Sequence, residues 1–350
     1  MALTRRGKVV TALVGACIFL TASVGALALT GHAPAPLQQV VDTVTGHDEP
    51  PPTCPLTGEA APKGGVPQRT ALAVKVENTD DAYPLAGLEG ADIVYEEIVE
   101  GGITRFIAIY HCGGAARVGP VRSARTTDPK ILLQVAAHPM LGYSGAADKV
   151  AQGVDDAGII GMTEASDPAA FTRDDTRIAP HNLFTGTSAL YRAAGRPARR
   201  EGPPAPLFTY DDQPQTPNKR VRSVDVSFSD ASVASWTWRQ GRWVRLLDGA
   251  LMVLEGGETL ATDNVVIQQV VVTDSGIIDA AGYPSPEVTM TGTGKAWILR
   301  GGRLIVGRWE RSDEDDLTIF RTRAGEEIHL APGTTFVELV PKGRPVAFAK

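Results

Sequence analysis

Short runs of apolar and polar residues that predict strands begin near residue 70. Residues 71–77 (ALAVKVE) alternate with a period of two, and residues 104–111 (TRFIAIYH) are rich in apolar, aromatic and β-branched side chains. Residues 91–99 (ADIVYEEIV) predict a strand or a short helix. Residues 128–137 (DPKILLQVAA) have helical spacing, with Pro129 in the first turn. We therefore expect strands and helices to mix in the first half of the chain.

The second half has a different pattern, in which β-branched or alternating runs are separated by glycine-containing turns. The strands predicted there are 221–228, 236–247, 265–273, 295–299, 303–309 and 335–340. All five tryptophans lie in this half, where a place in a β core is more usual than a sugar-binding surface. The fold class predicted for the whole chain is α+β, with a mixed α/β N-terminal domain followed by a mostly antiparallel, β-rich C-terminal domain.

Proline-rich segments divide the chain. Residues 31–53 hold five prolines and little apolar periodicity, which predicts a stiff stalk. A second group of prolines lies in residues 203–220 and predicts a linker between domains. The expected domains are therefore residues 54–202 and 221–350.

The first 30 residues predict a membrane anchor or a signal peptide. Arg5, Arg6 and Lys8 precede an uncharged apolar stretch, Val9–Thr30, which is long enough to span a bilayer. A cleaved signal peptide with a small-residue site at 26–28 is one alternative. A lipoprotein modified at Cys17 is another, although the apolar stretch continues well past that residue. All three interpretations predict a protein at the cell membrane whose body lies on the extracytoplasmic face.

Composition narrows the classes of function. The net charge of −6 argues against a nucleic-acid partner, because such proteins normally carry a basic surface. The sequence has no phosphate-loop, dinucleotide-binding or zinc-protease signature, so we expect neither a cofactor nor a metal site. Without a catalytic motif, a binding protein is expected rather than an enzyme.

Cys54 and Cys112 are the two cysteines beyond the apolar N-terminal segment. In an oxidising compartment two such thiols commonly pair, so we predict a disulfide between them. The alternative is two unpaired small residues.

Charged residues gather around glycine-containing turns in the first half. Glutamates precede Gly101-Gly102, and arginines follow these glycines and Gly119-Pro120; a second polar cluster lies near residue 175. Glycine-rich loops with arginines can bind an anion through backbone N–H groups and guanidinium donors. The candidate ligand-binding residues are Glu97, Glu100, Arg105, Arg122, Arg125, Arg173, Arg177, His181 and Asn182.

The three arginines at 105, 122 and 125 are expected on one face, with Arg177 and His181 close by. Neighbouring residues of a strand point to opposite faces, so at most one of Glu96 and Glu97 can face the arginines. This predicts a small excess of positive charge. The alternative is that the glutamates and arginines form structural ion pairs that hold loops in place.

Several motifs resemble the YerB-like family, also called DUF3048. They are residues 74–78 (VKVEN), 84–88 (PLAGL), 91–96 (ADIVYE), 99–106 (VEGGITRF), 119–125 (GPVRSAR), 171–174 (FTRD) and 179–183 (APHNL), with further matches between 292 and 334. The resemblance covers about residues 55–341. It implies a membrane-tethered or lipid-anchored protein of a Gram-positive envelope, and no settled enzymatic activity.

We therefore expect a membrane-tethered module that binds an anionic or sugar-containing cell-wall ligand, or a partner protein of the envelope. One alternative is a cell-wall glycan hydrolase or transferase that uses Glu97 or Glu100 together with the arginines. A structural spacer is the other.

Overall fold

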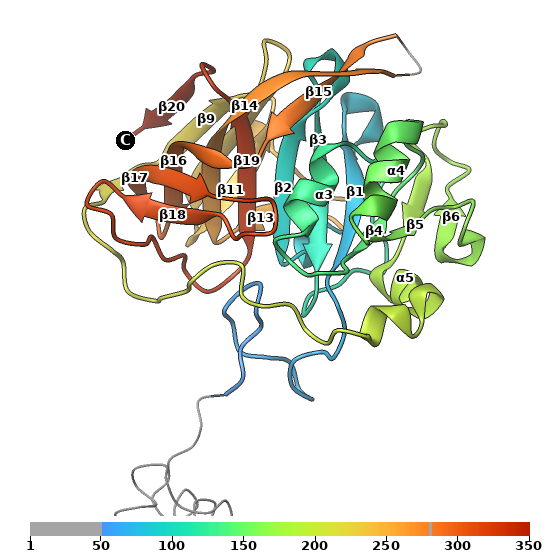
Figure 1. The fold of residues 1–350 in the computed structure, drawn as a ribbon. Helices are drawn as coiled ribbons and strands as arrows, with labels where there is room; N and C mark the ends of the chain where they lie inside the picture. The colour runs from blue at the N-terminus through green and yellow to red at the C-terminus, as the bar shows by residue number, and fades with distance from the viewer. Residues whose placement is uncertain (1–50, 280–281) are drawn as a thin grey trace, which may run out of the picture. The chain divides into compact units, whose positions relative to one another are not determined.

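A large mixed sheet forms the centre of the fold in this computed structural model, which describes residues 51–279 and 282–350 (Figure 1). Its main path runs β18-β17-β16-β14-β19-β2-β3-β1-β4-β5. The first half of the chain supplies β1 (Leu72–Asn78), β2 (Ile93–Ile98), β3 (Thr104–Tyr110), β4 (Met140–Gly142) and β5 (Ile160–Met162). The second half supplies β14 (Asn264–Ile278), β16 (Gly292–Arg300), β17 (Arg303–Arg311), β18 (Ile319–Thr322) and β19 (Thr335–Pro341), with β8 (Lys219–Arg220) beside β17 and β15 (Pro284–Thr289) beside β14.

The two halves share this sheet through one parallel pair of strands. β19 lies beside β2 in a register that sets Glu338 opposite Glu96. β19 is also parallel to β14, whereas the other strand pairs formed within the second half are antiparallel. The sheet is therefore continuous across the predicted domain boundary.

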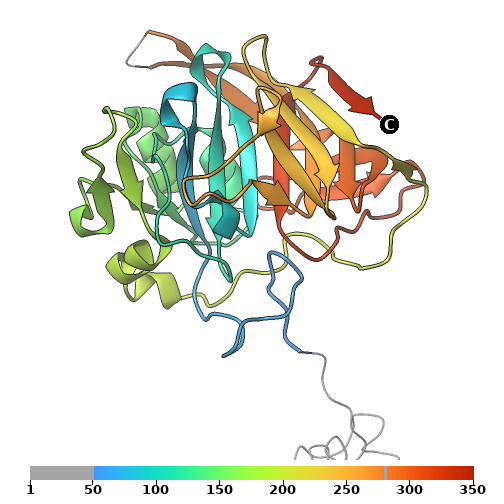
Figure 2. The same ribbon diagram turned by 180° about the vertical axis from the view of Figure 1, so that it is seen from behind.

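Helices cover one face of the sheet in the first half. α3 (Thr127–Leu132) and α4 (Asp148–Asp156) lie over β1 and β3, as both views show (Figures 1 and 2). Their apolar side chains, including Ile131 and Val154, pack with Ala73 and Ile107 of the strands in one core. A third helix, α5 (Thr187–Ala194), packs through Leu190 into the core on the opposite face.

A smaller antiparallel sheet packs on that opposite face. It consists of β9 (Ser223–Ser227), β10 (Val233–Arg239), β11 (Arg242–Leu247), β12 (Ala250–Leu251), β13 (Ala261–Thr262) and β20 (Val346–Ala349). The ring of Trp236 on β10 lies 4.8 Å from that of Phe336 on β19. The short strands β6 (Phe171–Arg173) and β7 (Leu183–Thr185) form a separate pair.

The predicted strands are present, with small changes at their ends. The run 91–99 forms a strand rather than a helix, and the run 236–247 forms a hairpin, β10 and β11, around the turn at Gln240-Gly241. The predicted helix at 128–137 ends at Leu132, and turns continue the chain from there to β4. The structure is mostly β, so the predicted label α+β describes it only loosely. The α-helices of the described residues are six to nine residues long and lie in the first half.

The predicted anchor Val9–Thr30, Cys17 and residues 31–50 of the stalk lie outside the described residues. Within residues 51–279 and 282–350, no helix is long and apolar enough to span a membrane. In the predicted linker 203–220 the only strand is β8, yet Leu207 and Phe208 are buried in the core. The boundary at this segment stays a prediction.

Candidate functional site

Strand alternation sorts the charged residues of β1, β2 and β3 onto the two faces of the large sheet. Arg105 lies between Glu77 of β1 and Glu97 of β2 in the register of the three strands. Side chains of residues paired across neighbouring strands lie on the same face of a sheet. Residues two apart along a strand also share a face, so these three side chains lie on the face of Ala73 and Ile107, which α3 and α4 cover. Glu96 points to the face that the smaller sheet covers.

Arg105, Arg122 and Arg125 come together at one end of these strands, and we call them the arginine face. Arg105 is on β3, and the segment after Gly119-Pro120 returns along β1, where the N–H of Arg122 donates to the carbonyl of Lys75 over 2.9 Å. Gly119 is required there: its φ is +148°, and a Cβ would lie 2.9 Å from the carbonyl oxygen of Leu183. The predicted turn thus forms and brings the three arginines together.

Arg125 is paired with Glu100. Its Nε donates to Oε2 of Glu100 over 3.0 Å, and its Nη1 donates to the carbonyls of Ser123 and Ala124 over 3.2 and 2.8 Å. The hydroxyl of Ser285 also donates to Glu100. Burial raises the pKa of Glu100, but the hydrogen bonds from Arg125 and Ser285 outweigh it and lower the pKa below its usual value. Glu100 is thus held as a carboxylate.

Arg122 and His181 share Glu77. Nε of Arg122 lies 3.3 Å from Oε1 of Glu77, and Nδ1 of His181 lies 3.0 Å from Oε2. Glu77 itself is buried, whereas Arg122 and His181 are each about one-fifth exposed. The predicted position of His181 beside the arginines is therefore found, and Glu77 makes the connection.

Arg105 has no ion-pair partner among the described residues, although it is only 7% exposed. Its guanidinium makes one long hydrogen bond, from Nη1 to the carbonyl of Ser123 at 3.5 Å, and its buried Nε has no acceptor. Burial, and then repulsion by Arg125 and Arg122, lower the pKa of Arg105 to about 10, and the charges of Glu100 and Glu77 offset only part of this effect. This guanidinium therefore has unused hydrogen-bond donors and no ion pair of its own.

Glu97 belongs to a sealed network instead. It forms an ion pair with Lys75, which also contacts Oδ1 of Asp128 at 2.7 Å, and all three side chains are fully buried. Burial raises the pKa of Glu97, partly offset by Lys75. The sequence analysis did not identify Lys75, Glu77 or Asp128 as site residues. Lys75 could have been identified, because it is a charged residue at a core-facing position of an otherwise apolar strand.

The three arginines have two carboxylate partners, Glu77 and Glu100, which matches the small excess of positive charge predicted for the arginine face. The balance differs only when the neighbouring network of Lys75 is included. Four basic residues, Lys75 and the three arginines, face four acidic ones: Glu77, Glu97, Glu100 and Asp128. The charges balance in number, but not in space, because two of the carboxylates pair with Lys75 and none with Arg105.

The remaining candidate residues lie apart from the arginine face. Arg173 pairs with Glu164, and its Nη1 donates to Oδ1 of Asn182 over 3.0 Å. Arg177 donates to the carbonyls of Ala82 and Pro84 over 2.9 and 2.8 Å. Neither arginine contacts Arg105, Arg122 or Arg125 within the described part of the chain, so these residues tie loops together.

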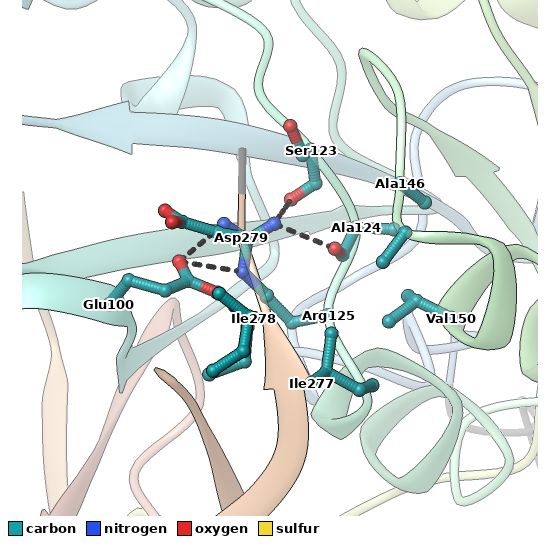
Figure 3. A pocket seen from close by; sticks show the side chains of 11 residues that line it. Glu100, Ser123, Ala124, Arg125, Ala146, Val150, Ile277, Ile278 and Asp279 are labelled. Atoms are coloured by element: carbon teal, nitrogen blue, oxygen red, sulfur yellow. Dashed lines mark hydrogen bonds and ion pairs between the residues drawn. The ribbon is translucent and has the colours of Figure 1, made fainter. Parts of the chain in front are cut away.

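A cavity of about 280 Å³ lies beside the arginine face (Figure 3). Glu100, Ser123 and Arg125 form a polar wall, with their ion pair and hydrogen bonds drawn in the figure. Val150 of α4 and Ile277 of β14 contribute apolar walls. The cavity thus has mixed chemistry, and its arginine is already neutralised by Glu100.

The predicted disulfide is present between Cys54 and Cys112, whose Cα atoms lie 6.0 Å apart. Within the described residues, no group of three or more His, Cys, Asp or Glu side chains could hold a metal ion.

A second charged cluster lies on the opposite face of the sheet, and sequence reasoning did not find it. We call Glu96, Glu338 and Arg245 the inner triad. Arg245 of β11 reaches Oε2 of Glu96 at 2.9 Å and Oε1 of Glu338 at 3.0 Å, and all three are nearly inaccessible to solvent. Burial and the neighbouring carboxylate of Glu96 raise the pKa of Glu338 well above its usual value. Arg245 therefore pairs with both carboxyl groups, while the proximity of Glu96 and burial disfavour ionisation of Glu338.

Comparison with known proteins shows the family to which the chain belongs. The model described as "Protein of unknown function (DUF3048) N-terminal domain" matches residues 56–199, and that of the DUF3048 C-terminal domain matches residues 224–337. The chain belongs to the DUF3048 family. The resemblance predicted from the motifs is confirmed, and the DUF3048 motifs supply Glu77, Glu100, His181 and all three members of the arginine face.

A protein of Bacillus subtilis (strain 168), named "Putative lipoprotein YerB", is 30% identical over 298 residues, which is 82% of this chain and 86% of that protein. The crystal structure of the YerB protein from Bacillus subtilis matches with a TM-score of 0.71 and 25% identity, over 84% of this chain and 99% of the other. The two chains are therefore similar over nearly the whole of the solved structure.

Proposed function

We propose that this chain is a membrane-tethered envelope protein that binds an anionic ligand of the cell wall at its arginine face, without catalysis. The tether is residues 1–30, as an uncleaved helix, or in a lipid-anchored form through Cys17. Support for the location comes from the name of the similar Bacillus protein, which calls it a lipoprotein. The Cys54–Cys112 disulfide also fits an oxidising compartment outside the cytoplasm.

The unpaired guanidinium of Arg105 is the observation that carries the proposal. A buried cation that has no direct ion pair is unfavourable, and a bound phosphate or carboxylate would supply both a directly paired charge and the missing hydrogen-bond acceptors. Arg122 flanks it and is one-fifth exposed, so an anion from solvent can reach this pair. A polymer with repeated anionic groups would present such an anion many times over.

The same geometry favours binding over glycan hydrolysis. Glu97 is fully buried against Lys75 and cannot touch a substrate. The pKa of Glu100 is lowered, which is opposite to the change that a general acid needs. His181 contacts Glu77 rather than either of these carboxylates.

Binding of inorganic pyrophosphate to the full-length chain, measured by calorimetry at about 20 and 200 mM salt, tests the anion site. Arg122→Ala should weaken binding about tenfold or more at low salt and less at high salt, because salt screens exposed charges. Arg173→Ala is the control, since it removes an exposed arginine of β6 that lies apart from the arginine face. Unchanged affinity in folded Arg122→Ala would remove the arginine face as the site.

Protease treatment of intact cells tests the location separately. A body outside the cytoplasm should be digested while cytoplasmic proteins stay intact. Full protection of residues 51–350 in intact cells would contradict the proposed topology.

A further inference from the structure

A polar cavity of about 380 Å³ lies between the two sheets, and we call it the intersheet cavity. The DUF3048 N-terminal domain lines it with Asn78, Tyr83, Glu96 and Thr104, and the C-terminal domain with residues 230–233, 235 and 245–249. Ligand sites occur preferentially at such junctions between domains. This cavity shares no residue with the arginine face.

Glu96 is fixed at the cavity wall by three neighbours. The hydroxyl of Thr104 donates to its Oε1 over 2.7 Å, the amide of Asn78 donates to the same oxygen over 3.1 Å, and Arg245 holds Oε2 at 2.9 Å. The hydrogen bonds are made within the protein and fix the carboxylate before any ligand arrives. The site is therefore preorganised.

The hydrogen-bond donors of the lining are largely used up inside the protein. Tyr83 donates its hydroxyl proton to Oδ1 of Asn78, and Ser235 donates to Asp225 over 2.7 Å. The amide of Asn78 donates to both Glu96 and Thr104. These groups can offer a ligand acceptor oxygens but few protons, so a ligand rich in donors is complementary to them.

The charges of the residues that line the cavity also favour a ligand that donates hydrogen bonds. Arg245 is balanced by Glu96, and Asp230 is paired with Arg344 at 2.6 Å. Asp80 and Asp248 line the exposed rim, and no ion pair or side-chain hydrogen bond within the described residues involves their carboxylates. Two negative charges are therefore left at the mouth of a cavity in which the side-chain donors of Asn78, Tyr83, Thr104 and Ser235 are already used.

We propose that the intersheet cavity binds a small organic cation that carries a primary ammonium group beside hydroxyl groups, as an amino sugar does. The ammonium group donates up to three hydrogen bonds and balances the charge of Asp80 and Asp248. The hydroxyl groups meet the acceptor oxygens of Tyr83 and Ser235. A phosphate or carboxylate ligand is excluded from this cavity by the same charges.

Calorimetry with D-glucosamine and N-acetyl-D-glucosamine tests the proposal, because the two sugars differ in the ammonium group that acetylation removes. The full-length chain in an amine-free buffer should bind D-glucosamine at least tenfold more tightly than its acetylated form. Asp80→Asn combined with Asp248→Asn should reduce the affinity for D-glucosamine at least tenfold. Both residues are exposed, and asparagine tolerates the positive φ of 51° at position 248, so the fold should survive.

Arg122→Ala serves as the control, since it lies outside this cavity and should leave D-glucosamine binding unchanged. Equal affinity for the two sugars, absence of D-glucosamine binding by folded protein, or full affinity in the double aspartate variant would each overturn the proposal. A loss of pyrophosphate binding in Arg122→Ala would bear only on the arginine face, so the two proposals fail separately.

Discussion

The arginine face and the inner triad lie on opposite faces of the large sheet, and their charges are paired to different extents. Glu96 and Glu97 of β2 point to opposite faces of the sheet. On the face of Glu96, a single arginine pairs with two carboxyl groups, and burial together with Glu96 raises the pKa of Glu338 well above its usual value. On the face of Glu97, the carboxylates pair with Lys75, Arg122 and Arg125, which leaves Arg105 alone.

The difference shows that the burial of a charged side chain does not by itself distinguish a structural role from a role in ligand binding. The inner triad lines the intersheet cavity through Glu96 and Arg245, and its charges pair with one another at the junction of the two halves. The arginine face is buried but lies at the ends of β1 and β3, where Arg122 and His181 are still partly exposed. A ligand that enters from solvent can supply the ion-pair partner that this network lacks.

Arg245→Ala should have the largest effect on stability, a loss of about 3–5 kcal/mol in the free energy of unfolding. It leaves the charge of Glu96 buried without a partner. Urea unfolding followed by tryptophan fluorescence measures the loss. Arg242→Ala is the matched control on the same strand: its pair with Asp263 is exposed, so the expected loss is about 0–1 kcal/mol. Similar losses in the two variants would show that the inner triad is not a structural network.

Glu338→Gln should flatten the pH dependence of stability. In the unfolded chain this carboxyl titrates near its ordinary pKa of 4.5, whereas in the folded chain its pKa is well above that value. Below the unfolded pKa both states hold the proton; as the pH rises, the unfolded state alone releases it, so the stability of the folded state decreases. The slope contributed by one proton is at most about 1.4 kcal/mol per pH unit.

Urea unfolding of the wild type and Glu338→Gln between about pH 4 and 7 measures this slope. The variant has no proton to lose and should decline less over the window. Glu326→Gln, an exposed change nearby in sequence, should follow the wild type. A variant that declines as steeply as the wild type would mean that Glu338 is not the group that holds the proton.

Arg105→Met should change stability by less than about 1 kcal/mol, in contrast to Arg245→Ala. Arg105 has no ion pair to lose, and methionine keeps much of its apolar contact while removing an unfavourably buried charge. Pyrophosphate binding should nevertheless disappear in this folded variant. A loss of several kcal/mol by urea unfolding would instead identify Arg105 as part of a structural network, like Arg245.

Cleavage in the segment 203–220 should have the smallest effect. Limited proteolysis is expected to cut there first, because β8 is its only strand. The two fragments should nevertheless elute together in gel filtration, since residues 335–338 of β19 pair with residues 93–96 of β2 in one continuous sheet. Fragments that separate under native conditions would show that the two halves are independent domains, and an earlier cut elsewhere would move the boundary.

The sequence by itself determined most of the strands, the disulfide and the family. Alternation at residues 71–77 and 104–111 depends on local periodicity, which survives in any tertiary setting. The same local rule correctly separated Glu96 from Glu97. The turn at Gly119-Pro120 likewise indicated that Arg122 and Arg125 would return toward Arg105.

Only the tertiary structure decided which charges meet. Arg245 reaches Glu96 across 149 positions of the chain, and Glu338 arrives beside it through the parallel pairing of β19 with β2. Arg177, predicted near the arginine face, donates instead to loop carbonyls at Ala82 and Pro84. Ion pairing depends on the distance in space between side chains that are far apart in the sequence, and this distance produces no pattern along the chain. The sequence therefore shows which residues are charged but not which of them remain unpaired.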